Sequence, residues 1–337
     1  HKTGKLNRLG TVEEGSTVSD FDDEEKERTH SVNASLLNTE HNGKKINILD
    51  APGYPDFVGA AIQSIPAAET GVVLVSAPQG IEINTRKMFK ACQDNNKPVI
   101  IVINKIDADN IALKELISNI QETFGSACRC ANLPSADRKS VIDCIGTPSG
   151  QSDIMDPADA HTELIESVIE ADDQLMEAYL GGEEITPDKA AKVFVKAMCQ
   201  GTIIPIVFTN ARDEVGVTEL LDLVASSAPA PDQVAPPVLT DGEEEKPVKI
   251  DPAGKLAGLV FRVNFDPKSN MKYASIKLFS GKIDSSTQLY INDDKKPTRI
   301  GSPLVSQGAD KDGEDRGRSA EGAALEPRIG VGKTEQP

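Results

Sequence analysis

Apolar residues gather into short runs that alternate with helical periods along the first two-thirds of the chain. Four runs predict strands at Ile46–Leu49, Gly71–Ser76, Pro98–Asn104 and Ile203–Thr209. Residues at helical spacing predict helices at Phe57–Ile65, Asn84–Asp94, Leu113–Phe124 and Val215–Ser227. This alternation predicts a doubly wound parallel sheet with right-handed crossovers.

The segment from about residue 125 to about residue 201 interrupts the alternation. One long helix is predicted over His161–Tyr179, because apolar residues fall on one stripe and acidic residues on the opposite face. The stripe consists of Leu164, Ile165, Val168, Ile169 and Leu175. The acidic residues are interpreted as a solvated face, and this segment carries no catalytic pattern.

The last third of the chain changes character. Residues 228–255 are rich in proline and acidic residues without apolar periodicity, which is typical of a linker. Short alternating runs then predict a small β-barrel over residues 256–306, with too few strands to close it. These runs are Gly258–Asn264, Ala274–Phe279, Gln288–Ile291 and Thr298–Ile300. Residues 307–337 have no period and are expected to form a disordered tail.

Charge and cysteine content narrow the class of protein. The 337 residues carry a formal net charge of −17, so the overall field would repel nucleic acid, and contact with RNA would need a local patch or a further domain. The sequence has no apparent signal peptide or membrane-spanning run, and its five cysteines form no C-x-x-C pattern. A multidomain cytoplasmic protein with reduced thiols is expected. Cys128, Cys130 and Cys144 are interpreted as buried apolar residues, with a metal site as the alternative.

Asn104-Lys105-Ile106-Asp107 follows a predicted strand and is the first candidate site. Ligands of open α/β sheets lie at the carboxyl ends of strands. The Asp107 carboxylate can accept two hydrogen bonds from a guanine edge, from N1–H and the exocyclic amine, whereas adenine offers no such pair. Asn104 can bond the acceptor side of the base and tie loops together, while the Lys105 stem covers the ring. This pattern predicts guanine binding.

Asp50-Ala51-Pro52-Gly53 follows the strand Ile46–Leu49 and is the second candidate site. An aspartate at a strand end can hold a water on Mg²⁺, and a glycine lets the backbone N–H approach a γ-phosphate. Alone, this turn is equally consistent with an ordinary strand-to-helix connection, since proline and glycine are common turn residues. Its order and distance relative to Asn104–Asp107 favour a guanine-nucleotide site.

Several stretches together resemble elongation factor G and its paralogues among the translational GTPases. Residues 50–57 are similar to that family's D-T-P-G-H-x-D-F, and residues 20–28 to its D-x-x-x-x-E-x-E-R. The similarity continues through residues 80–85 and 205–211 and enters a second domain from about residue 256 to residue 300. Departures from the family pattern favour the elongation-factor-G-like paralogues over the main factor.

The resemblance implies an α/β fold, in which a doubly wound parallel-sheet GTPase domain spans residues 1–227 and carries an inserted α/β subdomain at about 125–201, before the linker and incomplete β-barrel. It implies that GTP or GDP binds with Mg²⁺, and that Asn210 and Ala211 lie beside the guanine. It also implies GTP hydrolysis coupled to the ribosome, with ribosomal RNA and stalk proteins as partners and the inserted segment facing the stalk. A monomer without membrane or DNA contacts is expected.

The family's phosphate loop, G-x-x-x-x-G-K-[ST], does not occur upstream of Asp50, and the resemblance places it just before residue 1. The tail contains Gly330-Val331-Gly332-Lys333-Thr334, which is superficially similar. However, Pro327 occupies the first required glycine position, no strand is expected before the motif, and Glu335-Gln336-Pro337 cannot form the helix that should follow. The tail is therefore not expected to bind phosphate.

Two positions change the expected chemistry. Tyr54 stands where the family has the histidine that orients the attacking water, and a phenol cannot carry the positive charge of an imidazolium. Residues 28–32 match the family's R-G-I-T-I with Ser31 at the threonine position, which keeps the hydroxyl expected to bind Mg²⁺. His30 falls at the isoleucine position. It is interpreted as a solvated residue of an acidic segment, with replacement of the missing histidine as the alternative.

The sequence therefore predicts an elongation-factor-G-like translation factor whose activity is GTP hydrolysis. The alternative is a non-catalytic ribosome-associated protein that retains the fold, and the missing phosphate loop and Tyr54 favour that alternative. An unrelated ATPase is disfavoured because Asp107 selects guanine.

Overall fold

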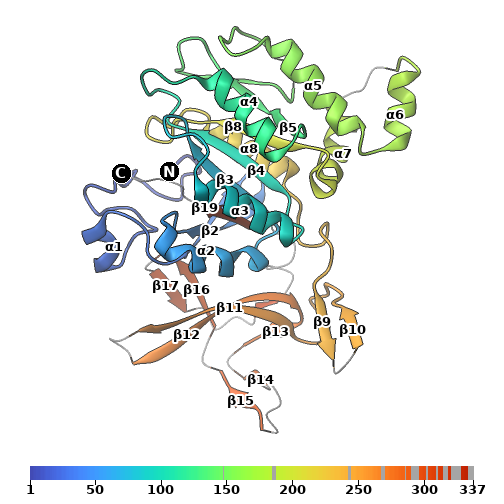
Figure 1. Cartoon of the computed structure of the whole chain (residues 1–337). Helices are drawn as coiled ribbons and strands as arrows, with labels where there is room; N and C mark the ends of the chain where they lie inside the picture. The colour runs from blue at the N-terminus through green and yellow to red at the C-terminus, as the bar shows by residue number, and fades with distance from the viewer. Residues whose placement is uncertain are drawn as a thin grey trace.

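A mixed sheet of seven strands lies at the centre of the described part of the chain (Figure 1). The strand order is β1-β2-β19-β3-β4-β8-β5, in which β1 runs antiparallel to β2 and all other neighbours are parallel. The strands are β1 (Ser35–His41), β2 (Lys44–Ala51), β3 (Thr70–Ser76), β4 (Val99–Asn104), β5 (Cys128–Cys130), β8 (Ile204–Phe208) and β19 (Arg328–Gly332). The computed structural model describes every residue except 147, 184–186, 242–243, 267–269, 285, 290–295, 301–302, 309, 314–317, 320–327 and 333–337.

The helices between these strands follow the predicted order. They are α2 (Val58–Ser64), α3 (Ile83–Asp94), α4 (Leu113–Phe124) and α8 (Val217–Ser227). The four predicted helices and the four predicted strands are confirmed, with bounds that differ by no more than about two residues. Strand β1 was not predicted, and neither were the short helix α1 (Asp23–Arg28) and the 3-10 turns η1 (Pro55–Phe57) and η2 (Ile65–Ala67) that flank α2.

Strand β4 shows why helices cover both faces of the sheet. Successive side chains of a strand point to opposite faces, and in β4 the residues on both faces are buried. Ile101 and Ile103 enter one apolar core, which α3 and α4 complete. Ile100 and Val102 enter a second core, which α8 helps to complete. A parallel sheet with helices on both faces confirms the predicted α/β class.

The segment at 125–201 is partly built into the main sheet. It contains β5 together with β6 (Asn132–Pro134), β7 (Val141–Asp143), α5 (Pro157–Ile169), α6 (Asp173–Leu180) and α7 (Pro187–Gln200). Strand β5 pairs with β8 as an edge of the central sheet. Leu164 of α5 and Phe194 of α7 belong to the same apolar core as Val102. A separate inserted subdomain is therefore not confirmed, although α5, α6 and α7 project to one end of the molecule (Figure 1).

The single helix predicted over His161–Tyr179 is wrong, because the structure has two helices there. The carboxylate of Asp172 accepts hydrogen bonds from the backbone N–H groups of Gln174 and Leu175 at 3.2 and 3.1 Å. An aspartate in this position is an N-cap, which begins a new helix. The chain consequently leaves α5 at residue 169 and starts α6 at residue 173.

Among the described residues, the strands between residues 228 and 319 pair two by two. The pairs are β9 (Val238–Asp241) with β10 (Glu244–Pro247), β11 (Ala257–Asp266) with β12 (Met271–Ser280), β13 (Lys282–Ile283) with β18 (Arg318–Ser319), β14 (Gln288–Leu289) with β15 (Thr298–Arg299), and β16 (Leu304–Gln307) with β17 (Asp310–Gly313). All four predicted runs contain strand, although Tyr290 and Ile291 lie outside the described residues. The predicted barrel is not confirmed, because these pairs do not join into one sheet.

The described residues after 307 differ from the expected disordered tail. Strands β17 and β18 lie in this segment, and β19 pairs in parallel with both β2 and β3 in the middle of the central sheet. Pairing of this kind depends on partners far away in the sequence, so the lack of a local apolar period could not reveal it.

The β11–β12 hairpin packs against the central sheet beside α2 (Figure 1). Phe261 of β11 joins a small apolar cluster with Leu49 of β2 and with Leu36, Ala67 and Ala68. The ammonium group of Lys277 on β12 is paired with the carboxylate of Glu69, directly before β3, and both side chains are almost completely buried. An apolar contact and a desolvated ion pair thus join the two parts of the chain.

The cysteines predicted to be buried are confirmed as part of the apolar core. Cys128, Cys130 and Cys144 are free thiols with exposures of 5% or less, and they belong to the core completed by α3 and α4. Burial raises the pKa of Cys128 and of Cys144 to about 12, which keeps both thiols protonated and unreactive near neutral pH.

No helix in the part of the chain that the structure describes has the length and apolar character needed to cross a bilayer.

Removal of one partner of the buried Lys277–Glu69 pair should destabilise the fold, because the other charge would stay buried without a counter-ion. Lys277→Met would leave the Glu69 carboxylate buried without its counter-ion, and we expect a loss of about 3–5 kcal/mol in the free energy of unfolding, measured with urea. Lys282→Met removes an exposed lysine from the neighbouring strand β13 and should cost less than about 0.5 kcal/mol. Equal losses in the two variants would contradict the buried pair.

The position of β19 leads to a second prediction about stability. Strands β2 and β3 both pair with β19, so Val331→Pro would remove a backbone N–H from a central strand of the sheet. Because the unpaired partner stays buried, we expect a loss of about 1–3 kcal/mol in the free energy of unfolding. Val331→Ile keeps the N–H and the strand preference and serves as the control. If the proline variant unfolds like the control, β19 does not hold this place in the sheet.

Candidate functional site

The carboxyl ends of the parallel strands form a stepped edge. Ser76 of β3 is level with Asn104 of β4, and Ile103 is level with Phe208 of β8. Through β19, the end of β2 at Ala51 is level with Val73, which is three residues before β3 ends. At about 3.3 Å per residue, the edge therefore drops by roughly 10 Å towards β2. Both motifs predicted from the sequence lie along this edge.

Asn104 joins the two loops at the higher part of the edge. Its amide oxygen accepts a hydrogen bond from the backbone N–H of Ala211 at 3.0 Å and one from the hydroxyl of Thr209 at 3.2 Å. The structure therefore brings Asn104 and Ala211 together, and the loop-tying role foreseen for Asn104 is observed. Within the described residues its amide nitrogen has no hydrogen-bond partner, so two N–H donors remain for a ligand.

Lys105 and Asp107 flank Ile106, a buried residue that anchors the loop after β4. Lys105 has a φ of 63°, which turns the chain sharply as it leaves β4. Ile106 is completely buried, and its N–H donates to the carbonyl oxygen of Thr209 at 3.4 Å. Asp107 is exposed beyond this anchor. The anchor keeps the carboxylate at the edge of the sheet and open to solvent.

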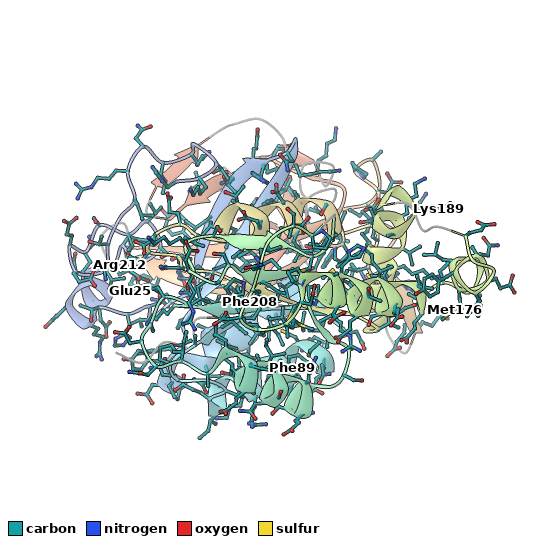
Figure 2. The ribbon with its side chains drawn as sticks, turned by 90° about the horizontal axis from the view of Figure 1, so that it is seen from above. Glu25, Phe89, Met176, Lys189, Phe208 and Arg212 are labelled. Atoms are coloured by element: carbon teal, nitrogen blue, oxygen red, sulfur yellow. The ribbon has the colours of Figure 1, made fainter. Side chains whose placement is uncertain are left out.

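The side chain of Asn210 forms hydrogen bonds within its own loop. Its side chain is 3% exposed, its amide nitrogen donates to Asp213 at 2.8 Å, and its amide oxygen accepts from the backbone N–H groups of Arg212 and Asp213. The Asn210 side chain therefore already bonds within its own turn through its amide nitrogen and its amide oxygen. Its contact with guanine stays a prediction. In the view down onto the molecule, Phe208 lies near the centre and Arg212 lies towards the side that carries Glu25 (Figure 2).

The turn after β2 is fastened to helix α3. The amide nitrogen of Asn84, in the first turn of α3, donates to the carbonyl oxygen of Gly53 at 2.7 Å. Asp50 is 8% exposed at the end of β2. No role for Asn84 was predicted from the sequence. The signal available was its place within residues 80–85, one of the stretches that carry the family resemblance.

A buried carboxylate organises the segment before β1. Glu25 of α1 is 1% exposed and accepts hydrogen bonds from the backbone N–H groups of Val32 and Asn33, each at 3.0 Å, and of Asp22 at 3.3 Å. Burial raises the pKa of Glu25, and the three donors oppose that rise. These contacts of Glu25 were not predicted from the sequence either. The three bonds draw residues 22–33 into a closed loop beside the turn after β2.

Ser31 is buried within this loop. Its hydroxyl donates to a carboxylate oxygen of Asp20 at 2.5 Å, and both residues are 5% exposed. The oxygen lone pairs of Ser31 remain able to bind a hard cation while its proton is held by Asp20. The metal role predicted for Ser31 and Asp50 stays a prediction.

His30 and Tyr54 are stacked against each other. Their ring centroids are 4.1 Å apart with an interplanar angle of 25°, and the ring of Phe57 lies 5.9 Å from that of His30. The interpretation of His30 as simply solvated is wrong, because its side chain is partly buried in this aromatic contact. The imidazole Nδ1 lies 2.8 Å from the carbonyl oxygen of Arg28.

The donor set at this edge fits a guanine nucleotide with Mg²⁺. Asn104 offers amide N–H donors and Asp107 offers an exposed carboxylate, which together match the acceptors and donors of guanine. Asp50 and Ser31 offer oxygen atoms, which are the ligands that Mg²⁺ prefers. Asp107, Asp50 and Ser31 therefore remain consistent with the predicted ligands.

The tail motif lies partly within the central sheet. Its residues Gly330, Val331 and Gly332 belong to β19 itself, which runs parallel to its neighbours and ends at the same edge as β2. Residues 320–327 lie outside the described residues, so the expectation that no strand precedes the motif stays a prediction. Lys333 and Thr334 lie outside the described residues.

Comparisons with known proteins agree with this geometry. The chain is 30% identical over 304 residues to an elongation factor G-like protein of Mycobacterium tuberculosis, which covers 85% of this chain and 42% of that protein. It is 28% identical over 321 residues to elongation factor G of Ureaplasma urealyticum, which covers 89% of this chain and 46% of that protein. The chain thus spans less than half the length of these relatives.

The fold is also similar to that of a crystal structure from Thermus thermophilus, with a TM-score of 0.78 and 26% identity over 97% of this chain and 48% of the other. The family of the elongation factor Tu GTP-binding domain matches residues 1–230. Since this match includes the stepped edge and both nucleotide motifs, the chain belongs to the family of the elongation factor Tu GTP-binding domain.

Proposed function

We propose that this chain is the nucleotide-binding part of an elongation-factor-G-like translation factor that binds GTP or GDP and hydrolyses GTP when it meets the ribosome. The observation that carries this proposal is the position of Asn104, whose amide oxygen holds Ala211 and Thr209 while its amide nitrogen is available to a base. Recognition of guanine would then come from Asn104 and Asp107, with Lys105 covering the ring and Ala211 and Asn210 shaping the pocket around it.

The turn after β2 would handle the phosphate end of the nucleotide. Gly53 would offer its backbone N–H to the γ-phosphate, and Asn84 holds the carbonyl of the same residue at 2.7 Å, which fixes the direction of that peptide. Asp50, through a water, and Ser31 would hold Mg²⁺. When bound, Mg²⁺ would neutralise charge on the phosphate oxygens. Tyr54 directly follows Gly53, so its side chain lies near the reacting end of the nucleotide in this proposal.

The wider assignment follows the family relationship. The GTPase domain would span residues 1–227, with the segment at 125–201 facing the stalk proteins of the ribosome, the linker at 228–255, and a barrel-like second domain beginning at residue 256. Elongation factor G is the name of the relative in Ureaplasma urealyticum, and translation in the cytoplasm by a monomer is the setting that we infer from it. The net charge of −17 disfavours binding to DNA.

A second candidate function is a ribosome-associated protein without catalytic activity. The observation that favours it is Tyr54, which replaces the imidazole expected to orient the attacking water with a neutral phenol. Nucleotide binding and ribosome binding would both survive in such a protein.

Hydrolysis measured with and without ribosomes separates the two candidates. Once the family's phosphate loop is joined upstream of residue 1, we expect the protein to bind GTP and GDP in preference to ATP, and its hydrolysis of GTP to rise on addition of ribosomes. Sedimentation with ribosomes without any hydrolysis would favour the non-catalytic protein. Failure to bind guanine nucleotide would contradict both.

The role of Asp107 gives a prediction about base preference. Asp107→Asn replaces two charged acceptors with an amide, so the affinity for GDP should fall by at least about tenfold. The affinity for xanthosine diphosphate should rise, because xanthine presents a carbonyl where guanine has its amine. Affinities are measured by calorimetry for both nucleotides. Asp109→Asn makes the same change in charge two residues away, and an equal effect there would remove the assignment of Asp107.

A further inference from the structure

We propose that His30 orients the attacking water, with Tyr54 as the residue that positions its imidazole. This inference rests on the proposed GTPase function. The family pattern has an isoleucine at position 30 and a histidine at position 54, whereas this chain has His30 and Tyr54. The chain therefore keeps one imidazole at this place in the structure and supplies it from a different segment.

The geometry brings the two positions together. His30 precedes β1, and Tyr54 follows β2, the strand paired with β1 in an antiparallel hairpin in which Ser35 lies opposite Asp50. The stacked rings, with 4.1 Å between centroids, place the imidazole of His30 against the face of the side chain that occupies the family's histidine position. Stacking of this kind stabilises a defined ring orientation. The ring of Phe57 also lies near the imidazole, with 5.9 Å between the ring centroids and an interplanar angle of 37°.

The hydrogen bond to Arg28 decides which imidazole nitrogen is available. A carbonyl oxygen can only accept, so Nδ1, at 2.8 Å from the Arg28 oxygen, carries the proton. In the neutral ring Nε2 is then a hydrogen-bond acceptor, which is the state required to accept a hydrogen bond from a water and turn its lone pair towards phosphorus. A solvated side chain would have neither a fixed tautomer nor a fixed ring plane.

The loop that carries His30 is held rigidly enough for this role. Glu25 accepts the N–H groups of Val32 and Asn33, two and three residues after His30, and the hydroxyl of Ser31 is bonded to Asp20. The side chains of Glu25, Ser31 and Asp20 are each 5% exposed or less, so solvent has little access to their polar atoms. The turn that carries Tyr54 is fastened to α3 through Asn84. Both halves of the stack therefore rest on fixed backbone.

The step that the residue would assist is simple hydrolysis. The water oxygen forms a bond to the γ-phosphorus while the bond from that phosphorus to the bridging oxygen breaks, and GDP leaves with the electron pair of the broken bond. The proton of the water ends on the released phosphate. His30 would align the water along this path, and alignment together with electrostatic stabilisation supplies most of the catalysis in such reactions.

Substitutions that remove the imidazole from position 30, or move it to position 54, test the inference. Single-turnover hydrolysis of GTP is measured with ribosomes on the protein that carries the family's phosphate loop upstream of residue 1, together with GTP affinity. His30→Phe keeps an aromatic stack without ring nitrogens, and His30→Ile restores the family's residue. We expect each to slow hydrolysis by about 10²-fold with little change in GTP affinity. The double variant H30I/Y54H should recover at least about tenfold of that loss, because the imidazole returns to position 54.

Two further variants complete the test. Tyr54→Phe keeps the stack without the hydroxyl and should slow hydrolysis less than about tenfold. A loss as large as that of His30→Phe would assign the water to the phenol and overturn the proposal. His41→Phe removes a histidine of β1 that is bonded to Asp222, and it should leave the rate unchanged.

The outcomes separate this inference from the proposed function. If the protein hydrolyses GTP and His30→Phe does so at the same rate, only the inference is overturned. If the protein binds GTP without hydrolysing it, the inference is overturned and the non-catalytic function is supported. If it binds no guanine nucleotide, the proposed function fails together with the inference.

Discussion

The burial of β4 on both faces is the constraint on which the rest of this structure depends. A strand whose side chains are apolar in both directions needs a layer of helices on each side, and Ile101 and Ile100 accordingly enter different cores. Helices on both faces require crossover connections, which make the neighbouring strands parallel. Parallel strands end at one edge, so the polar residues that follow them are brought together there. The location of Asn104 and Asp50 at a common edge is a consequence of this apolar strand.

Buried and half-buried polar side chains hold the loops at that edge in place. Asn104 joins the loops after β4 and β8, Asn84 holds the turn after β2, and Glu25 closes the segment before β1. A buried polar group must find a partner, because leaving it unsatisfied costs about 1–3 kcal/mol. Each of these side chains therefore fixes the backbone that bonds to it, and a site is formed at an edge that hydrophobic packing alone would leave loose.

Elements with a strong apolar period could be predicted from the sequence, since burial leaves a pattern over several residues. Helix α4 has the predicted bounds for this reason. The break between α5 and α6 left no such trace, because the apolar stripe continues across it and the cap at Asp172 alone decides where the new helix begins. In the site, the motif residues were proposed from the sequence because their side chains suit a guanine nucleotide, and their ligand-binding roles stay predictions. The contacts of Glu25 were not predicted, because no period or motif marks the nearby backbone N–H groups that it binds. The contacts of Asn84 and His30 were not predicted, because their partners Gly53 and Tyr54 lie in another segment.

The second part of the chain meets the sheet close to the step in its edge. Leu49, which directly precedes Asp50, packs with Phe261 of β11, and Glu69, directly before β3, is paired with Lys277 of β12. The turn after β2 is consequently held from two sides, by Asn84 of α3 and through Leu49 by the β11–β12 hairpin. A displacement of that turn would open an apolar contact and strain a buried ion pair, neither of which water can replace at low cost. The hairpin therefore supports the turn proposed to face the phosphates, while among the described residues the proposed base side is held by the loops that Asn104 joins.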